Sequence, residues 1–160
     1  MRRRIGMPAL KAAVLVLTLC PIAASAADSL GVFLLGPGPG ERSICELRFR
    51  LSQPLPPRAS FRVQFASGFD LSEVLLVGSD RIDGGLSFRR DGNQIIVSRS
   101  GLGHGIPAGE LLDLKIANLR TPSVMSEAGP VRVTILGPTE TLAELAARAE
   151  FRSAERGEQR

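Results

Sequence analysis

The chain has 160 residues and a formal net charge of +4, with 44% hydrophobic and 4% aromatic residues. The excess charge comes from Arg2, Arg3, Arg4 and Lys11, so residues 27–160 carry 16 basic and 16 acidic residues. A neutral chain has no overall field that steers polyanions, which excludes nucleic-acid binding driven by net charge. The length of residues 27–160 fits one domain with its own core.

Residues 1–26 have the pattern of a secretory signal peptide. A basic start precedes the apolar run Ala12–Leu19, and Ala24-Ser25-Ala26 supplies the small residues that signal peptidase requires. The apolar segment is shorter than the roughly 20 residues that span a bilayer, and Pro21 interrupts it. We therefore expect cleavage before Ala27, export to the periplasm or the outside of the cell, and no integral membrane span in the mature chain.

Residues 27–43 predict an N-terminal strand followed by a linker. Leu30–Leu35 is a short apolar run, and the segment 36–40 after it alternates glycine with proline. The next run, Ile44–Leu51, alternates apolar and polar residues, which is typical of a half-buried strand. Its apolar positions are Cys45, Leu47, Phe49 and Leu51, and its polar positions include Glu46, Arg48 and Arg50.

Further short strands are expected along the chain, separated by turn residues. They are Ser60–Ala66, Ser72–Val77, Leu86–Arg90, Gln94–Ser98, Leu111–Leu119 and Val131–Leu136. Asp91-Gly92-Asn93 joins two of them as a hairpin. Seven or eight such strands predict an all-β fold, an immunoglobulin-like two-sheet antiparallel sandwich with its domain at residues 44–138.

Residues 139–160 depart from this alternation. Thr141-x-x-Glu144 fits a capping box, and the positions with helical spacing are Leu142, Leu145, Ala146 and Ala149. Strand-like alternation returns around Phe151. We therefore predict a short C-terminal helix, with passage into a strand near Phe151 left open, and a frayed polar end after it.

The stretch from Phe61 to Leu136 resembles immunoglobulin-like and cohesin-like β-sandwich modules of bacterial exported and cell-surface proteins. The segments that carry the resemblance are Phe65–Phe69, Ile106–Gly109, Leu112–Ile116, Asn118, Pro122, Gly129 and Val131–Ile135. They are turn and core positions and cover about half of the chain. The resemblance implies a sandwich and carries no catalytic residue, so it does not assign a function.

Polar residues near two turns are candidates for a ligand or metal site. His104, the single histidine, lies among glycines and is a candidate ligand-binding residue or general base. Asp80 and Asp83, which precede Gly84-Gly85, are candidate ligands of a metal ion such as Ca²⁺, together with Asp70 upstream. The alternatives are a solvated loop histidine and ordinary turn aspartates, which the composition favours.

Arginine and cysteine residues on the predicted strands are candidates for contact with a partner. Arg48, Arg50 and Arg62 point outward in the alternation and form a basic stripe if their strands are neighbours. Such a stripe suits an anionic partner, whereas the alternative is a solvated sheet face. Cys45 is left unpaired once Cys20 is removed with the signal peptide, so it is either a buried small apolar residue or the site of an intermolecular disulfide.

These patterns favour a non-catalytic exported module that contacts an envelope or extracellular protein and needs no cofactor. The alternative is a module that binds a ligand, a glycan or a metal ion through the His104 loop and the aspartate-rich turns. A hydrolase with His104 as base is a third and weaker hypothesis, because no nucleophile and acid accompany that residue at a suitable spacing. The oligomeric state stays open.

Overall fold

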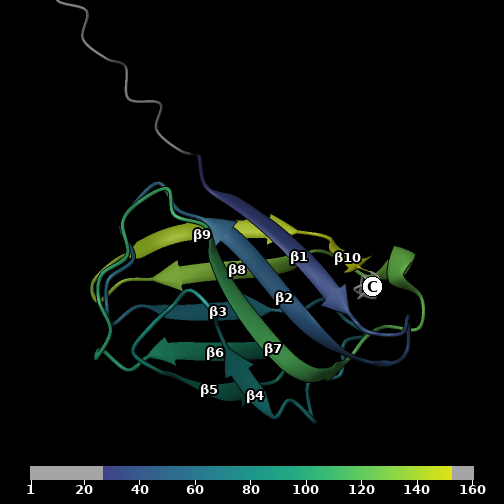
Figure 1. Cartoon of the computed structure of the whole chain (residues 1–160). Helices are drawn as coiled ribbons and strands as arrows, with labels where there is room; N and C mark the ends of the chain where they lie inside the picture. Colours follow the sequence, from purple (N-terminus) through teal and green to yellow (C-terminus); the bar gives the residue numbers. More distant parts are fainter. Residues whose placement is uncertain (1–26, 153–160) are drawn as a thin grey trace, which may run out of the picture.

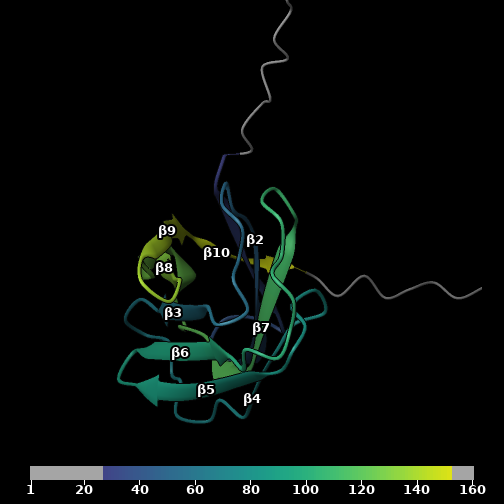
Figure 2. The same cartoon turned by 90° about the vertical axis from the view of Figure 1, so that its left-hand side faces the viewer.

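The computed structural model describes residues 27–152. They form ten strands in two five-stranded sheets that pack against each other (Figures 1 and 2). Strands of one sheet run obliquely across those of the other, and loops close both ends of the sandwich (Figure 1). The predicted signal peptide and the predicted frayed end lie outside the described residues.

The first sheet has the strand order β10-β1-β2-β7-β4. These strands are β10 (Ala149–Arg152), β1 (Ser29–Leu35), β2 (Arg42–Arg50), β7 (Leu112–Arg120) and β4 (Leu76–Gly78). The alternation expected around Ile44–Leu51 is confirmed, because Cys45, Leu47 and Phe49 are buried. One pair departs from the predicted antiparallel arrangement: β1 and β10 run parallel, with Phe33 opposite Glu150.

The second sheet has the strand order β5-β6-β3-β8-β9 and is antiparallel throughout. These strands are β5 (Leu86–Asp91), β6 (Gln94–Arg99), β3 (Ser60–Gln64), β8 (Val131–Leu136) and β9 (Thr141–Ala147). The expected hairpin is present, and Asp91 pairs with Gln94 across a two-residue turn. Gly92 takes a φ of 57° in that turn, where a side chain on Cβ would be strained.

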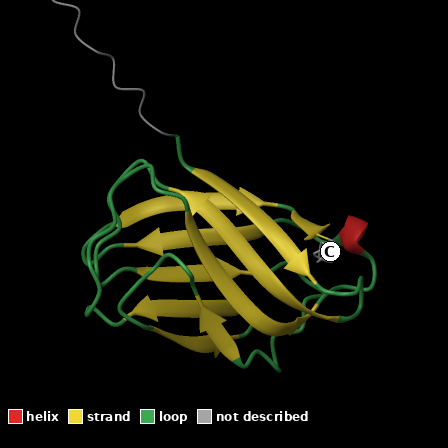
Figure 3. Cartoon of the chain, viewed as in Figure 1, coloured by secondary structure: helices red, strands yellow, loops and turns green. Residues whose placement is uncertain are grey.

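The prediction of a short C-terminal helix is wrong. Residues 141–152 form β9 and β10, and the one helical segment within residues 27–152 is the 3₁₀ turn Met125–Glu127 (Figure 3). β9 pairs with the free edge of β8, which satisfies its backbone and buries Ala143. This edge outweighs the capping-box pattern, because a short helix gains little stability without a packed face.

The sheets extend beyond residues 44–138 at both ends. Eight strands were expected at most, and the two additional ones are β9 and β10. The chain leaves the second sheet after Ala147 and enters the first at Ala149, so its last strand lies beside β1 (Figure 1). β1 thus belongs to the sandwich, with β2 on one side and β10 on the other.

The core lies between the two sheets and is built from the inward faces of their strands. Phe49 of the first sheet meets Phe61 of the second, with ring centroids 5.8 Å apart. Leu47, Leu114 and Ile135 are fully buried around them. Because the apolar face of each sheet packs against the other sheet, the two outward faces point in opposite directions. Within residues 27–152, no helix is long and apolar enough to cross a membrane.

Candidate functional site

The predicted basic stripe is divided between the two sides of the molecule. Arg48 and Arg50 lie on β2 in the first sheet, and Arg62 lies on β3 in the second. The prediction that they form one stripe is therefore wrong. Local alternation placed each side chain outward correctly, but it carried no information on which sheet each strand joins.

The arginines of β2 on the outward face of the first sheet have contacts within the protein. Arg48 pairs with the buried carboxylate of Glu46 at 3.0 Å and lies 5.7 Å from the ring centroid of Phe33. Arg152 stacks on the same ring at 3.6 Å. Arg50 donates a 2.6 Å hydrogen bond to the Gly109 carbonyl. Each of these three cations therefore has a contact of this kind within the protein, which Arg62 lacks among the described residues.

The outward face of the second sheet is different, because its central cation has no partner. Strand register aligns one row across all five strands: Arg89, Ile96, Arg62, Thr134 and Glu144. The central member, Arg62, is exposed and, within residues 27–152, makes no side-chain hydrogen bond or ion pair. Its guanidinium therefore keeps its donors free.

A second free arginine lies beside this row. Arg132 of β8 is opposite Gln64 of β3, and within the described chain its side chain also has no hydrogen-bond or ion-pair partner. Arg89 approaches the Asp91 carboxylate only to 3.8 Å, in an exposed pair. We call this outward surface, with Arg62, Arg89 and Arg132, the Arg62 face. Of these three, Arg62 is the candidate predicted from the sequence, and strand order brings the other two to the same face.

His104 is part of a junction between two loops. Its ring is 94% exposed, with Nδ1 at 2.9 Å from Oδ2 of Asp83, and its backbone N–H also donates to that carboxylate. The His104 hydrogen bonds, first of all that of the side chain, hold the pKa of Asp83 below its ordinary value. Since Asp83 is then ionised, the Nδ1–H is the donor.

Arg99 fastens this junction from inside the sandwich. Its side chain is 1% exposed and lies 3.0 Å from the Asp83 carboxylate. It also donates to the carbonyls of Pro56 at 2.7 Å and His104 at 2.8 Å. Asp83 thus orients the His104 ring, but the carboxylate of Asp83 also forms an ion pair with Arg99. We call this set of contacts among Asp83, Arg99 and His104 the Arg99 clasp, because it holds two loops together. That His104 binds a ligand stays a prediction.

Two of the three aspartates predicted as metal ligands serve separate networks. Asp80 pairs with Lys115, an interaction that raises the pKa of that ammonium group, whereas Asp83 belongs to the Arg99 clasp. The buried carboxylate of Asp113 accepts hydrogen bonds from the Ser79 hydroxyl and the Asp80 backbone. In the part of the chain that the structure describes, no three His, Cys, Asp or Glu side chains are grouped to hold a metal ion.

Cys45 is buried among core residues. It is 0% exposed, and burial, assisted by the nearby charge of Glu46, raises the pKa of its thiol to about 12. A protonated, inaccessible thiol neither attacks nor is attacked in disulfide exchange. The interpretation as a small buried apolar residue is confirmed, and an intermolecular disulfide at this position is incompatible with the fold as it stands.

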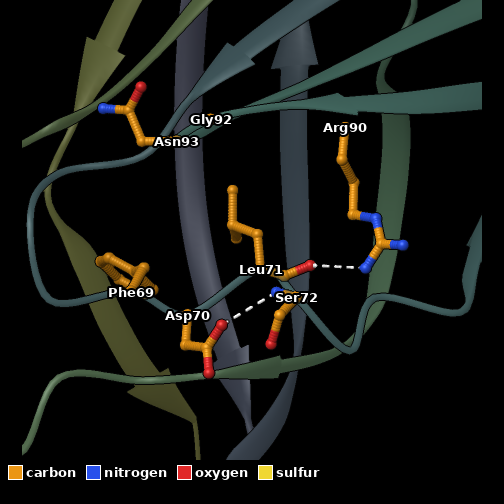
Figure 4. Close-up of a pocket in the computed structure, with 7 residues that line it drawn as sticks. All are labelled: Phe69, Asp70, Leu71, Ser72, Arg90, Gly92 and Asn93. Atoms are coloured by element: carbon orange, nitrogen blue, oxygen red, sulfur yellow. Dashed lines mark hydrogen bonds between the residues drawn. The ribbon is translucent and has the colours of Figure 1, made fainter.

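A cavity of about 370 Å³ opens at one end of the sandwich, beside the β5–β6 turn. Two segments line it: Phe69–Ser72 and Arg90–Asn93 (Figure 4). Figure 4 shows Arg90 and Phe69 on opposite sides, with Leu71 and Asp70 between them. We call this cavity the Arg90 pocket. This pocket was not predicted from the sequence, because the two segments that line it are distant in the sequence and only the fold brings them together.

No family model and no curated protein matches this sequence. The structure is similar to a cohesin module of a Clostridium perfringens family 33 glycoside hydrolase (18% identity, TM-score 0.47, 78% of this chain and 96% of that chain). It is also similar to a non-cellulosomal cohesin of Archaeoglobus fulgidus (13%, 0.42, 83% and 95%) and to the chitin-binding domain of a Pyrococcus furiosus chitinase (12%, 0.41, 69% and 88%). Cohesin modules, which the sequence resembles, are thus among the structural neighbours, and the likeness extends to the sandwich architecture alone.

Proposed function

We propose that this chain is a non-catalytic exported binding module that recognises an acidic protein surface in the cell envelope or outside the cell, through the Arg62 face. The observation that carries the proposal is the free guanidinium of Arg62 at the centre of a five-stranded sheet. Arginine presents a planar fork that matches a carboxylate, and it is enriched at the centres of protein interfaces.

The surroundings of Arg62 support a macromolecular partner. Ile96 and Thr134 flank it in the same row and are half-buried, so they offer contact area beside the charge. Arg132 on the neighbouring strand β8 and Arg89 on the edge strand β5 add positive charge, whereas Glu144 and Asp91 are acidic. A sheet face with a central cation between an isoleucine and a threonine suits contact with a protein surface better than binding of a small substrate, which needs a cleft.

A flat glycan platform is a poorer fit for this surface. The chain has no Trp and no Tyr, and no Phe lies in the row through Arg62. The His104 loop does not favour catalysis either, because its aspartate is held by the buried Arg99. A protein partner with clustered carboxylates satisfies the free guanidinium groups directly.

Charge reversal tests this proposal. The variants Arg62→Glu and Arg132→Glu are compared with Arg81→Glu, which makes the same change in charge at an exposed residue outside the second sheet. Tagged chains are cross-linked in the native envelope and recovered at equal expression. We expect the partner to be lost from both face variants and retained by Arg81→Glu. Equal recovery by all three variants, or no partner of the wild-type chain, would contradict the proposal.

A further inference from the structure

The β5–β6 hairpin has two inward-facing arginines, one near each end, and they differ in burial and in hydrogen bonding. Arg90 pairs in register with the fully buried Ile95, and Arg99 lies two positions beyond the buried Val97 on β6. Both side chains therefore enter the space between the sheets. Arg99 is enclosed and donates to several carbonyls and to Asp83. Arg90 is exposed and makes one long hydrogen bond, 3.5 Å to the Leu71 carbonyl.

An inward charge on an edge strand such as β5 discourages pairing with other chains, which accounts for a cation at this position. It does not account for the pocket around that cation. Asp70 faces the same cavity as Arg90 (Figure 4), and within the described chain the two do not form an ion pair. Of the Asp70 carboxylate, Oδ1 accepts the Ser72 backbone N–H at 2.9 Å. Among the described residues, Asp70 therefore has Ser72 as its hydrogen-bond partner and Arg90 has only the Leu71 carbonyl, and neither group is bonded to the other.

Both walls of the pocket are fixed in place by other strands. The backbone of Asp70 exchanges hydrogen bonds of 3.0 and 2.9 Å with Arg120 at the end of β7. On the other wall, the side-chain amide of Asn93 donates to the Phe65 carbonyl at 3.0 Å, and the Phe65 N–H donates to the Asn93 carbonyl. A pocket held in this way loses little entropy when a ligand binds.

The floor of the pocket is apolar. Leu71 is 5% exposed, and Phe69 packs against Phe65 with ring centroids 5.3 Å apart, which leaves it half-buried at the cavity. The cavity volume of about 370 Å³ lies within the range of roughly 300–1,000 Å³ typical of small-molecule sites. One face of a bound molecule would therefore contact the apolar side chains of Leu71 and Phe69, and its edge would contact the charged groups of Arg90 and Asp70.

We propose that the Arg90 pocket binds a neutral pyranose sugar. A singly charged ligand would satisfy either Arg90 or Asp70 and leave the other group opposed, whereas sugar hydroxyls both donate and accept. Asp70 accepts from one hydroxyl, Arg90 donates to another hydroxyl oxygen, and the C–H face of the ring covers Phe69 and Leu71. This site is independent of the Arg62 face, because Arg90 points inward from β5 where Arg89 points outward.

The test is a titration of the ¹⁵N-labelled mature protein with glucose, galactose and N-acetylglucosamine, read at backbone amides. We expect saturable shifts at Leu71, Ser72, Gly92 and Asn93 with at least one of the three sugars. Arg90→Met and Asp70→Asn are each expected to weaken binding about tenfold or more, since each removes a charged hydrogen-bond partner. Arg58→Met, an exposed arginine on a distant loop, is the matched control and should bind as the wild type does.

Three results would overturn the proposal. The first is the absence of saturable shifts with all three sugars. The second is binding that Arg90→Met leaves unchanged while its spectrum shows a folded protein. The third is preferential binding of acetate or inorganic phosphate that Asp70→Asn strengthens, because that outcome would identify an anion site at Arg90.

Discussion

Two inward arginines on one hairpin show how residue-scale context decides the role of the same side chain. Arg99 is surrounded by acceptors, so its charge serves the fold. Arg90, near the other end of the hairpin, faces an open cavity with one long hydrogen bond. The alternation along β5 and β6 explains why both side chains point inward. Whether each one finds hydrogen-bond acceptors depends on the loops that pack near it, and only Arg99 has several.

The first prediction at this scale concerns Arg99. Replacement by Met leaves the carbonyls of Pro56 and His104 without the Arg99 donor, and it removes one of the hydrogen-bond donors of Asp83. We expect a loss of about 1–3 kcal/mol in the free energy of unfolding, measured by urea denaturation, because part-buried carbonyl acceptors lose their donor while Asp83 is half exposed. Arg99→Lys retains the charge without the fork and should recover part of this loss. A loss below that of an ordinary exposed substitution would show that the clasp is not structural.

The second prediction concerns the pH dependence of the same clasp. The pKa of Asp83 is lowered in the folded protein, first by the His104 side-chain hydrogen bond, so the ionised form is favoured by folding. The resulting stability is present above the ordinary pKa of an aspartate and is lost as the pH falls through the lowered value. Asp83→Asn should therefore reduce the thermal midpoint at neutral pH and have a progressively smaller effect in acid. A difference between the two proteins that stays constant from pH 7 to pH 2 would contradict this assignment.

At the scale of elements, strand pairing outweighs local pattern at the C-terminal end. Residues 141–149 contain a helical set and a strand set of small apolar residues, and neither is decisive alone. The exposed edge of β8 selects the strand, because pairing buries Ala143 and satisfies the backbone of both strands. Val131–Leu136, by contrast, was predicted with the bounds that β8 has, because its alternation is unambiguous.

A pair of substitutions distinguishes the strand from the helix. In β9 Ala143 is 7% exposed and Ala146 is exposed, whereas the helical spacing places Ala146 on the buried face. Ala143→Glu should destabilise the protein by several kcal/mol because it buries a charge. Ala146→Glu should change the stability by no more than about 0.5 kcal/mol. The reverse order in denaturant unfolding would contradict the assignment of β9.

At the scale of the whole molecule, the sequence predicted the sandwich and the outward direction of its charges, but not which charges share a surface. Arg48 and Arg62 belong to strands with the same alternation, and they lie on opposite sides because β2 and β3 join different sheets. Arg132 comes beside β3 through pairing between distant segments. Sheet order depends on the cooperative packing of all strands, so no local pattern contains it.

The two outward faces of the sandwich differ, and we expect a partner to bind only one of them. The first sheet has cations paired with Glu46 and stacked on Phe33, whereas the second leaves Arg62 without a partner among residues 27–152. A partner should therefore cover the second sheet and leave the first exposed. This asymmetry can be measured without knowledge of the partner, because the two outward faces point in opposite directions.

The most direct measurement is site-specific photo-cross-linking in the native envelope, with the photoreactive residue at Gln64 in the Arg62 face or at Ile44 on the first sheet. Gln64 is half-buried on β3, and Ile44 is 39% exposed on β2, so either position can report contact. We predict a protein adduct from position 64 that Arg62→Glu abolishes, and no equivalent adduct from position 44. An adduct from position 44 alone, or one from position 64 that Arg62→Glu leaves intact, would contradict the account.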